Sequence, residues 1–143
     1  MALRHAREGA EDDREAVKAD LDALKMNPEL DSLIGLATSG RTPYVLSGLE
    51  YAKRLGCVTI GITCVSPSAI AAEGNTDFVI AAITGPEVVT GSTRMKAGTA
   101  QKMILNMLST GVMIKSGKTY GNLVRDSAAY GQITFLTDRR WST

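Results

Sequence analysis

The hydrophobic positions of this chain recur with helical spacing in three segments. Residues 12–26 carry an apolar stripe behind an acidic start, and acidic residues suit the positive end of a helix dipole. Residues 43–55 follow the same period from Pro43, which suits a first helical turn, up to Gly56. A longer apolar segment at 93–115 predicts a third helix, whose hydrophobic side chains are expected in the core.

Between these helices lie short apolar runs without a helical period. They are typical of buried parallel strands, and they occupy residues 33–37, 57–62 and 77–81. Strands that alternate with helices predict an α/β fold, with a parallel sheet of about three strands and right-handed crossovers. In this architecture ligands bind beyond the carboxyl ends of the strands, where the loops Thr38–Thr42 and Thr84–Lys96 lie.

Composition narrows the class of protein. The chain has 143 residues, of which 44% are hydrophobic and 22% are charged, and this is the composition of one soluble globular domain. Its net charge of +1 gives no strong field to attract nucleic acid or an anionic membrane. No secretory signal or membrane-spanning segment is expected, and Cys57 and Cys64 are expected to be buried free thiols in the cytoplasm.

The loop after the first predicted strand has the chemistry of a phosphate site. It contains three hydroxyls, a glycine and a guanidinium directly before a helix, from the residues Thr38, Ser39, Gly40, Arg41 and Thr42. Hydroxyls and backbone N–H groups at a strand-to-helix turn can converge on an anion. By pattern alone, an ordinary N-capping turn explains the same residues at least as well.

The loop before the long helix repeats this chemistry with more positive charge. Ser92 and Thr93 supply hydroxyls, and Arg94 and Lys96 place cations at a helix start, where they oppose the dipole. Residues that oppose the helix dipole and bring no gain in stability often belong to a functional site. Capping residues beside a solvated face remain an equally weighted interpretation.

Three stretches of the sequence carry a resemblance to a known family. The segment 85–126, with GPEVVTGSTRMKAGTAQK at its start, closely resembles the signature of the N-acetylmuramic acid 6-phosphate etherases of the sugar-isomerase (SIS) superfamily. SGRTPYV at 39–45 is nearly verbatim the second phosphate loop of these enzymes, and EGAED at 8–12 is also theirs. The resemblance runs from about residue 3 to residue 126.

The resemblance implies a set of site residues. Ser39 and Thr42 would bind the sugar phosphate with nearby main-chain amides, and Glu11 would be one of two catalytic carboxylates. By pattern alone Glu11 belongs to an acidic helix start. The full substrate-binding set that we expect comprises Thr38, Ser39, Gly40, Arg41, Thr42, Glu87, Ser92, Thr93, Arg94 and Lys96.

The resemblance also implies a fold and an activity. Residues 1–126 would form a partial SIS domain, a three-layer sandwich with a long C-terminal-side helix, followed by a divergent tail at 127–143. The enzymes cleave a lactyl ether by elimination and hydration on a phosphorylated amino sugar. They use no metal or organic cofactor, and they are commonly homodimers.

The family's first phosphate loop and its other catalytic glutamate have no counterpart in this sequence. Two other interpretations therefore stay open. One is a non-catalytic phosphosugar-binding module like the glucokinase regulatory protein, and the other is a non-functional gene fragment.

Overall fold

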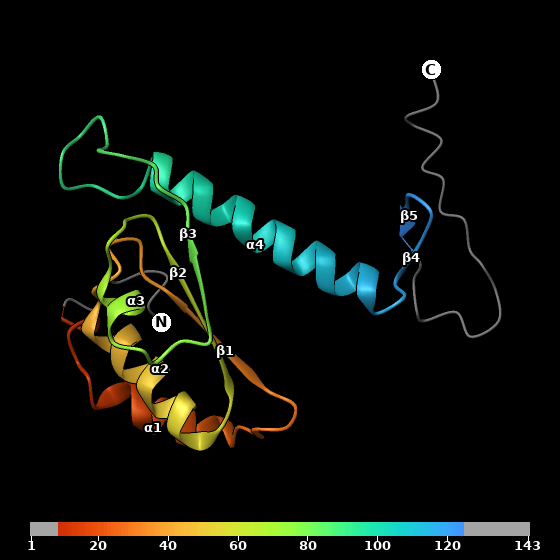
Figure 1. The fold of residues 1–143 in the computed structure, drawn as a ribbon, viewed down its shortest axis with the longest axis horizontal. Helices are drawn as coiled ribbons and strands as arrows, with labels where there is room; N and C mark the ends of the chain where they lie inside the picture. The colour runs from red at the N-terminus through yellow and green to blue at the C-terminus, as the bar shows by residue number, and fades with distance from the viewer. Residues whose placement is uncertain (1–8, 125–143) are drawn as a thin grey trace. The chain divides into compact units, whose positions relative to one another are not determined.

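The computed structural model describes residues 9–124 of the chain, so the predicted tail at 127–143 lies outside the described residues. The chain divides into two compact units, residues 1–102 and 103–143, and the boundary falls within the long helix. In chain order the elements are α1 (Ala16–Leu24), β1 (Ser32–Leu36), α2 (Pro43–Leu55), β2 (Val58–Thr63), α3 (Ala69–Ala72), β3 (Phe78–Ala81), α4 (Lys96–Lys115), β4 (Thr119–Tyr120) and β5 (Leu123–Val124) (Figure 1).

The first unit contains a parallel sheet in the order β1-β2-β3. Ile34 of β1 lies opposite Ile60 of β2, which in turn lies opposite Phe78 of β3. Helix α2 connects β1 to β2, and the short helix α3 lies between β2 and β3. The predicted α/β fold with three parallel strands and a long helix is confirmed. Helix α3 was not predicted, and β4 and β5 form a separate antiparallel pair in the second unit.

Side-chain caps shift the start of two helices from the predicted positions. The carboxylate of Asp13 accepts the backbone N–H groups of Glu15 and Ala16, both at 3.0 Å, so α1 begins at Ala16 rather than at residue 12. The carboxylate of Glu87 accepts the N–H groups at the start of α4, which begins at Lys96 rather than at residue 93. The spacing of apolar residues does not show where a polar side chain caps a helix, so it could not predict these helix starts.

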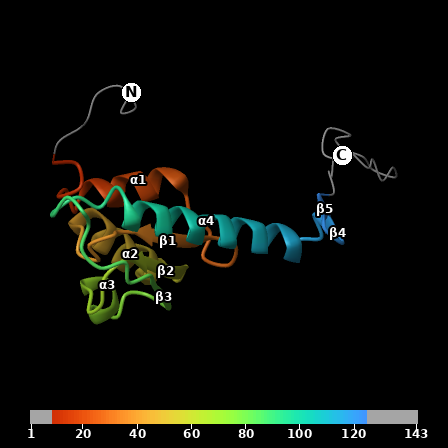
Figure 2. The same cartoon turned by 90° about the horizontal axis from the view of Figure 1, so that it is seen from above.

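Helix α2 packs against one face of the sheet, across β1 and β2. Gly35 makes this approach close, because a Cβ atom at this position would lie 2.8 Å from Leu49 Cδ1 and from Val45 Cγ1. The core cluster of this unit includes Ala37, Leu46, Leu49 and Ile70. Helix α1 packs on α2 and buries Val17 and Leu21 (Figure 2).

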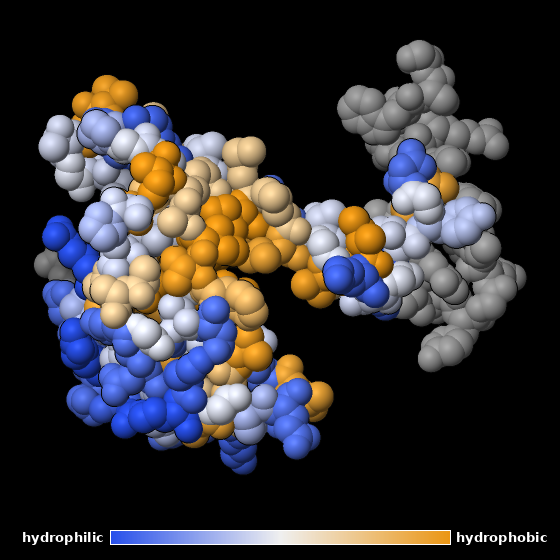
Figure 3. All heavy atoms as spheres, viewed as in Figure 1, coloured by the Kyte–Doolittle hydropathy of each residue, from blue (hydrophilic) through white to orange (hydrophobic). Residues whose placement is uncertain are grey.

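The opposite face of the sheet is apolar and reaches the surface of the first unit. Ile34 and Phe78 share this face by register with Ile60, and the two residues are 39% and 62% exposed. Figure 3 shows hydrophobic residues at the surface of the described part of the chain. Burial on both faces, as the continuous apolar runs predicted, holds only for the carboxyl half of β2, where Ile62 and Thr63 are fully buried. In β1 the residues of this face remain in contact with solvent, and in β3 residues of both faces do, since the neighbours Phe78 and Val79 are both exposed.

Apart from Ala97, which is buried, the hydrophobic side chains of α4 are not in a core. Met103 is 60% exposed and Met107 is 72% exposed, so the expectation for this helix was wrong in the described structure. The two cysteines, Cys57 and Cys64, are buried and free, as predicted. Among residues 9–124, none of the helices has the length and hydrophobicity needed to cross a bilayer.

Candidate functional site

A cavity of about 1020 Å³ opens in the first unit at the carboxyl end of β1. Its walls come from the segment before α1, from α1 itself, from the loop between β1 and α2, and from the region where α4 begins. The lining residues are Gly9, Ala10, Glu11, Asp13, Ala16, Asp20, Leu36, Ala37, Thr38, Ser39, Thr42, Tyr44, Val45, Thr93 and Gln101. The position agrees with the rule that parallel sheets bind ligands beyond their strand ends.

The loop before α2 lines the cavity with unused hydrogen-bond donors. Thr42 is the N-cap residue of α2, but its hydroxyl makes no capping bond to the helix. Within residues 9–124, the backbone N–H groups of Ser39, Arg41 and Thr42 donate to no protein acceptor. Donors left unsatisfied at a helix start are suited to an anion, which also gains from the helix dipole.

Gly40 fixes the path of this loop. Its φ of +66° is left-handed, and a Cβ atom here would lie 2.5 Å from Ser68 Cβ and 2.8 Å from Thr63 Oγ1. Its carbonyl accepts the N–H group of Ile70 at 3.0 Å, which joins the loop to α3. Only glycine meets both requirements without displacement of its neighbours.

Helix α2 also holds the segment that contains Glu11. The backbone N–H group of Tyr44 donates to the carbonyl of Glu11 at 3.0 Å, and the hydroxyl of Ser47 donates to the carbonyl of Arg14 at 2.8 Å. The side chain of Glu11 is exposed and lines the cavity. The same helix therefore carries the donor loop at its start and holds the main chain of the segment that bears Glu11.

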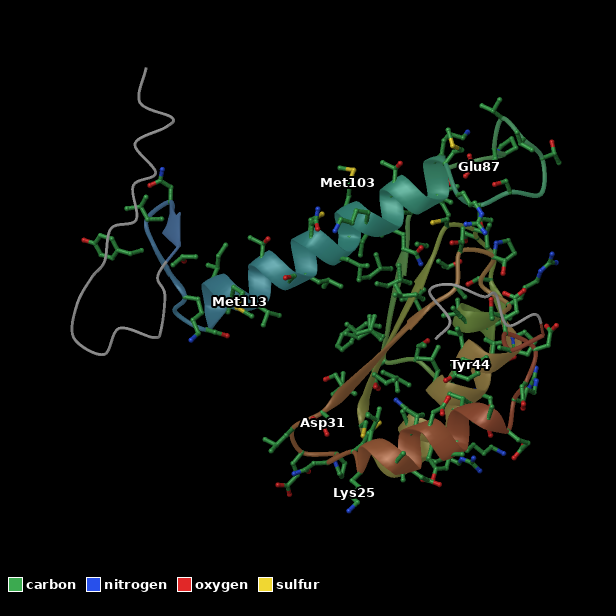
Figure 4. The ribbon with its side chains drawn as sticks, turned by 180° about the vertical axis from the view of Figure 1, so that it is seen from behind. Lys25, Asp31, Tyr44, Glu87, Met103 and Met113 are labelled. Carbon is green, nitrogen blue, oxygen red and sulfur yellow. The ribbon has the colours of Figure 1, made fainter. Side chains whose placement is uncertain are left out.

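A tyrosine and an aspartate form a hydrogen-bonded pair on the cavity wall. The hydroxyl of Tyr44 donates to Oδ2 of Asp20 at 2.7 Å (Figure 4). This bond raises the pKa of Tyr44, because deprotonation would place two negative charges side by side.

The loop before α4 is organised by Glu87. Its Oε2 accepts the N–H group of Lys96 at 3.0 Å, and its Oε1 accepts that of Ala97 at 3.1 Å (Figure 4). These two bonds lower the pKa of Glu87. The hydroxyl of Ser92 accepts the N–H group of Arg94 at 3.3 Å. In this structure the two polar side chains Glu87 and Ser92 serve the loop and the helix start.

The structure brings five of the predicted site residues to one cavity: Glu11, Thr38, Ser39, Thr42 and Thr93. The remaining predicted residues are not on its wall, and these are Gly40, Arg41, Glu87, Ser92, Arg94 and Lys96. Gly40 and Arg41 belong to the lining loop itself, between Ser39 and Thr42. A role in substrate binding stays a prediction for the whole set.

Sequence reasoning missed four polar residues of the cavity: Asp13, Asp20, Tyr44 and Gln101. A signal existed for two of them, since Asp13, Ala16 and Asp20 recur at a spacing of one helical face. Tyr44 lies inside the SGRTPYV stretch, directly after the loop. Across the part of the chain that the structure describes, no group of three or more His, Cys, Asp or Glu side chains could hold a metal ion.

Comparison with known proteins identifies the family of the chain. The chain is 59% identical over 129 residues to the N-acetylmuramic acid 6-phosphate etherase of Pasteurella multocida (strain Pm70). It is 57% identical over 128 residues to the protein of that name from Escherichia coli (strain K12 / DH10B). Each match covers 90% of this chain and 42% of the relative, so the chain spans less than half the length of these curated relatives. The family model described as "SIS domain" matches residues 14–111, and the chain therefore belongs to the SIS domain family.

Proposed function

We propose that this chain carries the phosphosugar-binding part of an N-acetylmuramic acid 6-phosphate etherase, a carbon–oxygen lyase. One observation carries the proposal: a single cavity is lined both by Glu11 and by the Thr38–Thr42 loop with its unused donors. The names of the relatives supply the substrate, because they are etherases of N-acetylmuramic acid 6-phosphate.

The phosphate of the sugar binds at the start of α2. Ser39 and Thr42 donate from their hydroxyls and their backbone N–H groups, and Thr38 adds a third hydroxyl on the same wall. Arg41 is an exposed residue of this loop and adds positive charge. The donors of Thr93 face the cavity from the loop before α4. Gly40 contributes through its backbone conformation.

The remaining predicted residues act around the second loop. Glu87 holds the first amides of α4, which fixes the loop that bears Ser92 and Thr93. Arg94 and Lys96 are exposed cations near this loop, where they strengthen the attraction for a phosphorylated ligand.

The reaction converts N-acetylmuramic acid 6-phosphate and water to N-acetylglucosamine 6-phosphate and D-lactate. A base removes the proton beside the sugar carbonyl, an acid protonates the departing lactate oxygen, and water then adds to the unsaturated sugar. Two carboxyl groups in different environments can divide these tasks. Glu11 supplies one of them, and its main chain is held by the hydrogen bond from the Tyr44 N–H group to the Glu11 carbonyl. No metal and no organic cofactor is required for these steps.

The test measures D-lactate release from N-acetylmuramic acid 6-phosphate. The 143-residue chain is expected to release none above background, because only one of the two catalytic carboxylates is assigned within it. We call the joined protein a fusion of this chain with the part of the Pasteurella relative that the chain does not span. The joined protein is expected to be active. Glu11→Gln should then lower the rate by ~10²–10⁴.

The control is Glu73→Gln, an exposed carboxylate outside the cavity, which should leave the rate unchanged. An active joined protein that is indifferent to Glu11→Gln would contradict the role of Glu11. Rapid lactate release by the chain alone would contradict the need for a second carboxylate from elsewhere.

The setting of the protein follows from this activity. We place it in the cytoplasm, where phosphorylated amino sugars from the cell wall are recycled. We also propose that it functions as a homodimer, with the apolar sheet face and α4 as the surfaces that gain most from a partner. Nucleic acid and membranes are not partners in this proposal.

A second candidate is a phosphosugar-binding module without catalysis. The observation that favours it is that the donor loop is built entirely within this chain, whereas the pair of catalytic carboxylates is not assigned within it. Binding of N-acetylglucosamine 6-phosphate by the joined protein, without lactate release from the etherase substrate, would favour the module.

A further inference from the structure

Two tyrosine–aspartate hydrogen bonds join α2 to α1. The hydroxyl of Tyr44 donates to Oδ2 of Asp20 at 2.7 Å, and the hydroxyl of Tyr51 donates to Oδ1 of Asp22. Chemically the two pairs are the same. They differ in place, because Tyr44 and Asp20 line the cavity, whereas Tyr51 and Asp22 do not.

The pair on the cavity wall presents acceptors only. The proton of the Tyr44 hydroxyl is already donated to Asp20, and the raised pKa of Tyr44 keeps that proton in place at neutral pH. The remaining lone pairs of the phenol oxygen are free to accept. The second carboxylate oxygen of Asp20 accepts no hydrogen bond from the described residues, 9–124. This wall therefore suits hydroxyl and amide N–H donors, and its negative charge disfavours an anion.

The loop before α2, which lines the same cavity, has the reverse chemistry. Ser39 and Thr42 offer donors at the positive end of α2, as an anion requires. A phosphorylated sugar has the matching asymmetry, because its phosphate only accepts in the dianionic form, and its ring carries hydroxyl donors. The two walls together can bind such a ligand in one direction.

We propose that Tyr44 and Asp20 bind the hydroxyl groups of the sugar ring and determine the orientation and selectivity of the site for a phosphosugar over a bare anion. This inference rests on the proposed function, in which the ligand is a phosphorylated amino sugar. It assigns to α1 a direct role in binding, through a residue on the same helical face as Ala16.

The experiment compares two ligands on the full 143-residue chain by NMR titration: N-acetylglucosamine 6-phosphate and inorganic phosphate. Asp20→Asn should weaken binding of the sugar phosphate about tenfold, because it loses a charged acceptor. The same variant should bind inorganic phosphate as well as the original chain or better, because a nearby negative charge is gone. Tyr44→Phe should weaken binding of the sugar phosphate by about two- to tenfold and leave inorganic phosphate unchanged.

The matched control is Tyr51→Phe, which removes the equivalent bond outside the cavity and should change neither affinity. Thermal melts of all three variants report their folding. A role limited to holding α1 on α2 would weaken both ligands together and would make Tyr51→Phe resemble Tyr44→Phe, so either result overturns the inference. Unchanged affinity for the sugar phosphate in Asp20→Asn and Tyr44→Phe overturns it as well.

Failure of the proposed function gives a different pattern. In that case the original chain binds neither ligand, or it binds inorganic phosphate with no preference for the sugar phosphate. The first result removes the phosphate site together with the inference. The second leaves an anion site in place and shows that Tyr44 and Asp20 bind no sugar.

Discussion

At the scale of single residues, the site depends on polar groups that the fold leaves without partners. Thr42 stands at the N-cap of α2 yet makes no capping bond, and the N–H groups of Ser39 and Arg41 are unused in the described residues. Groups in this state bind solvent and are suited to an anion that replaces it, which supports the proposed phosphate site at this turn.

Replacement of both hydroxyls should remove most of the phosphate affinity. Hydrogen bonds to a charged group contribute ~1.5–3 kcal/mol each, so Ser39→Ala with Thr42→Ala should weaken binding of N-acetylglucosamine 6-phosphate by ~10²-fold or more. Isothermal titration of the joined protein measures the change. Ser116→Ala, an exposed hydroxyl after α4, is the control, and equal affinity in the double variant would remove both residues from the site.

A second residue-scale prediction concerns pH and Asp77. Its carboxylate accepts from Lys53 and from the N–H and hydroxyl groups of Thr59, which lowers the pKa of Asp77 from 3.8 to about 2. The folded-state pKa lies below the unfolded one. The contribution to stability is therefore complete above pH 3.8 and is lost as the pH falls toward 2.

Urea unfolding at several pH values measures this loss. The denaturation midpoint of Asp77→Asn should be lower than that of the original chain at neutral pH, and the two should converge as the pH falls from 4 to 2. Glu73→Gln, which changes an exposed carboxylate, should keep the original pH dependence. A constant gap between Asp77→Asn and the original chain across this pH range would contradict the assignment.

At the scale of elements, α2 is the centre of the first unit. It packs on β1 and β2, carries α1 on its outer side, and begins at the donor loop. Leu49 lies at the contact with Gly35 and is 1% exposed. Truncation of this side chain should therefore affect both the sheet and the site.

Leu49→Ala should lower the free energy of unfolding by ~2–5 kcal/mol, because it removes buried methyl groups and leaves a cavity that the glycine opposite cannot fill. Leu55→Ala on the same helix, where the side chain is 40% exposed, should cost less than ~1 kcal/mol. Chemical denaturation followed by circular dichroism compares them. Similar losses for both variants would contradict the packing of α2 on β1.

The elements show what the sequence could and could not predict. Continuous apolar runs predicted β1 to β3, a helical period predicted α2, and their alternation predicted the fold class. The four residues of α3 are too few to show a period. Helix starts were misplaced at α1 and α4, since Asp13 and Glu87 cap them from outside the apolar pattern.

In the candidate site, too, some residues could be predicted from the sequence and others could not. The Thr38–Thr42 loop is local in the sequence, so its chemistry and its position after a strand could be predicted together. The pair of Asp20 and Tyr44 is separated by 24 positions and exists only because α1 packs on α2. No spacing rule within one element contains that contact.

At the scale of the whole molecule, apolar surface remains uncovered in each unit. In the first unit the sheet exposes Ile34 and Phe78, and in the second unit Met103 and Met107 of α4 are exposed. Such surface is a property of proteins that associate. The chain is therefore expected to form dimers or larger assemblies at micromolar concentration.

Substitution on the sheet face should reduce this association. Burial of a large apolar side chain contributes ~1.5–3 kcal/mol, so Ile34→Ser with Phe78→Ser should raise the dissociation constant by at least ~10-fold. Sedimentation velocity over a range of concentrations measures it. Leu30→Ser is the control, since Leu30 is 82% exposed and lies outside the sheet. A compact monomer at every concentration would contradict the prediction.

The cap that Glu87 places on α4 also determines how many helix N-termini near the cavity have N–H groups available to a free anion. Two helices begin near the cavity, and each start would attract phosphate on its own. At α4 the position is already taken by a carboxylate of the chain itself, bonded to the N–H groups of Lys96 and Ala97. At the start of α2, no carboxylate among the described residues accepts the free N–H groups. In the proposed binding mode, a ligand with one phosphate therefore finds unused donors at the start of α2 alone. The Glu87 carboxylate at the start of α4 would disfavour the reverse orientation.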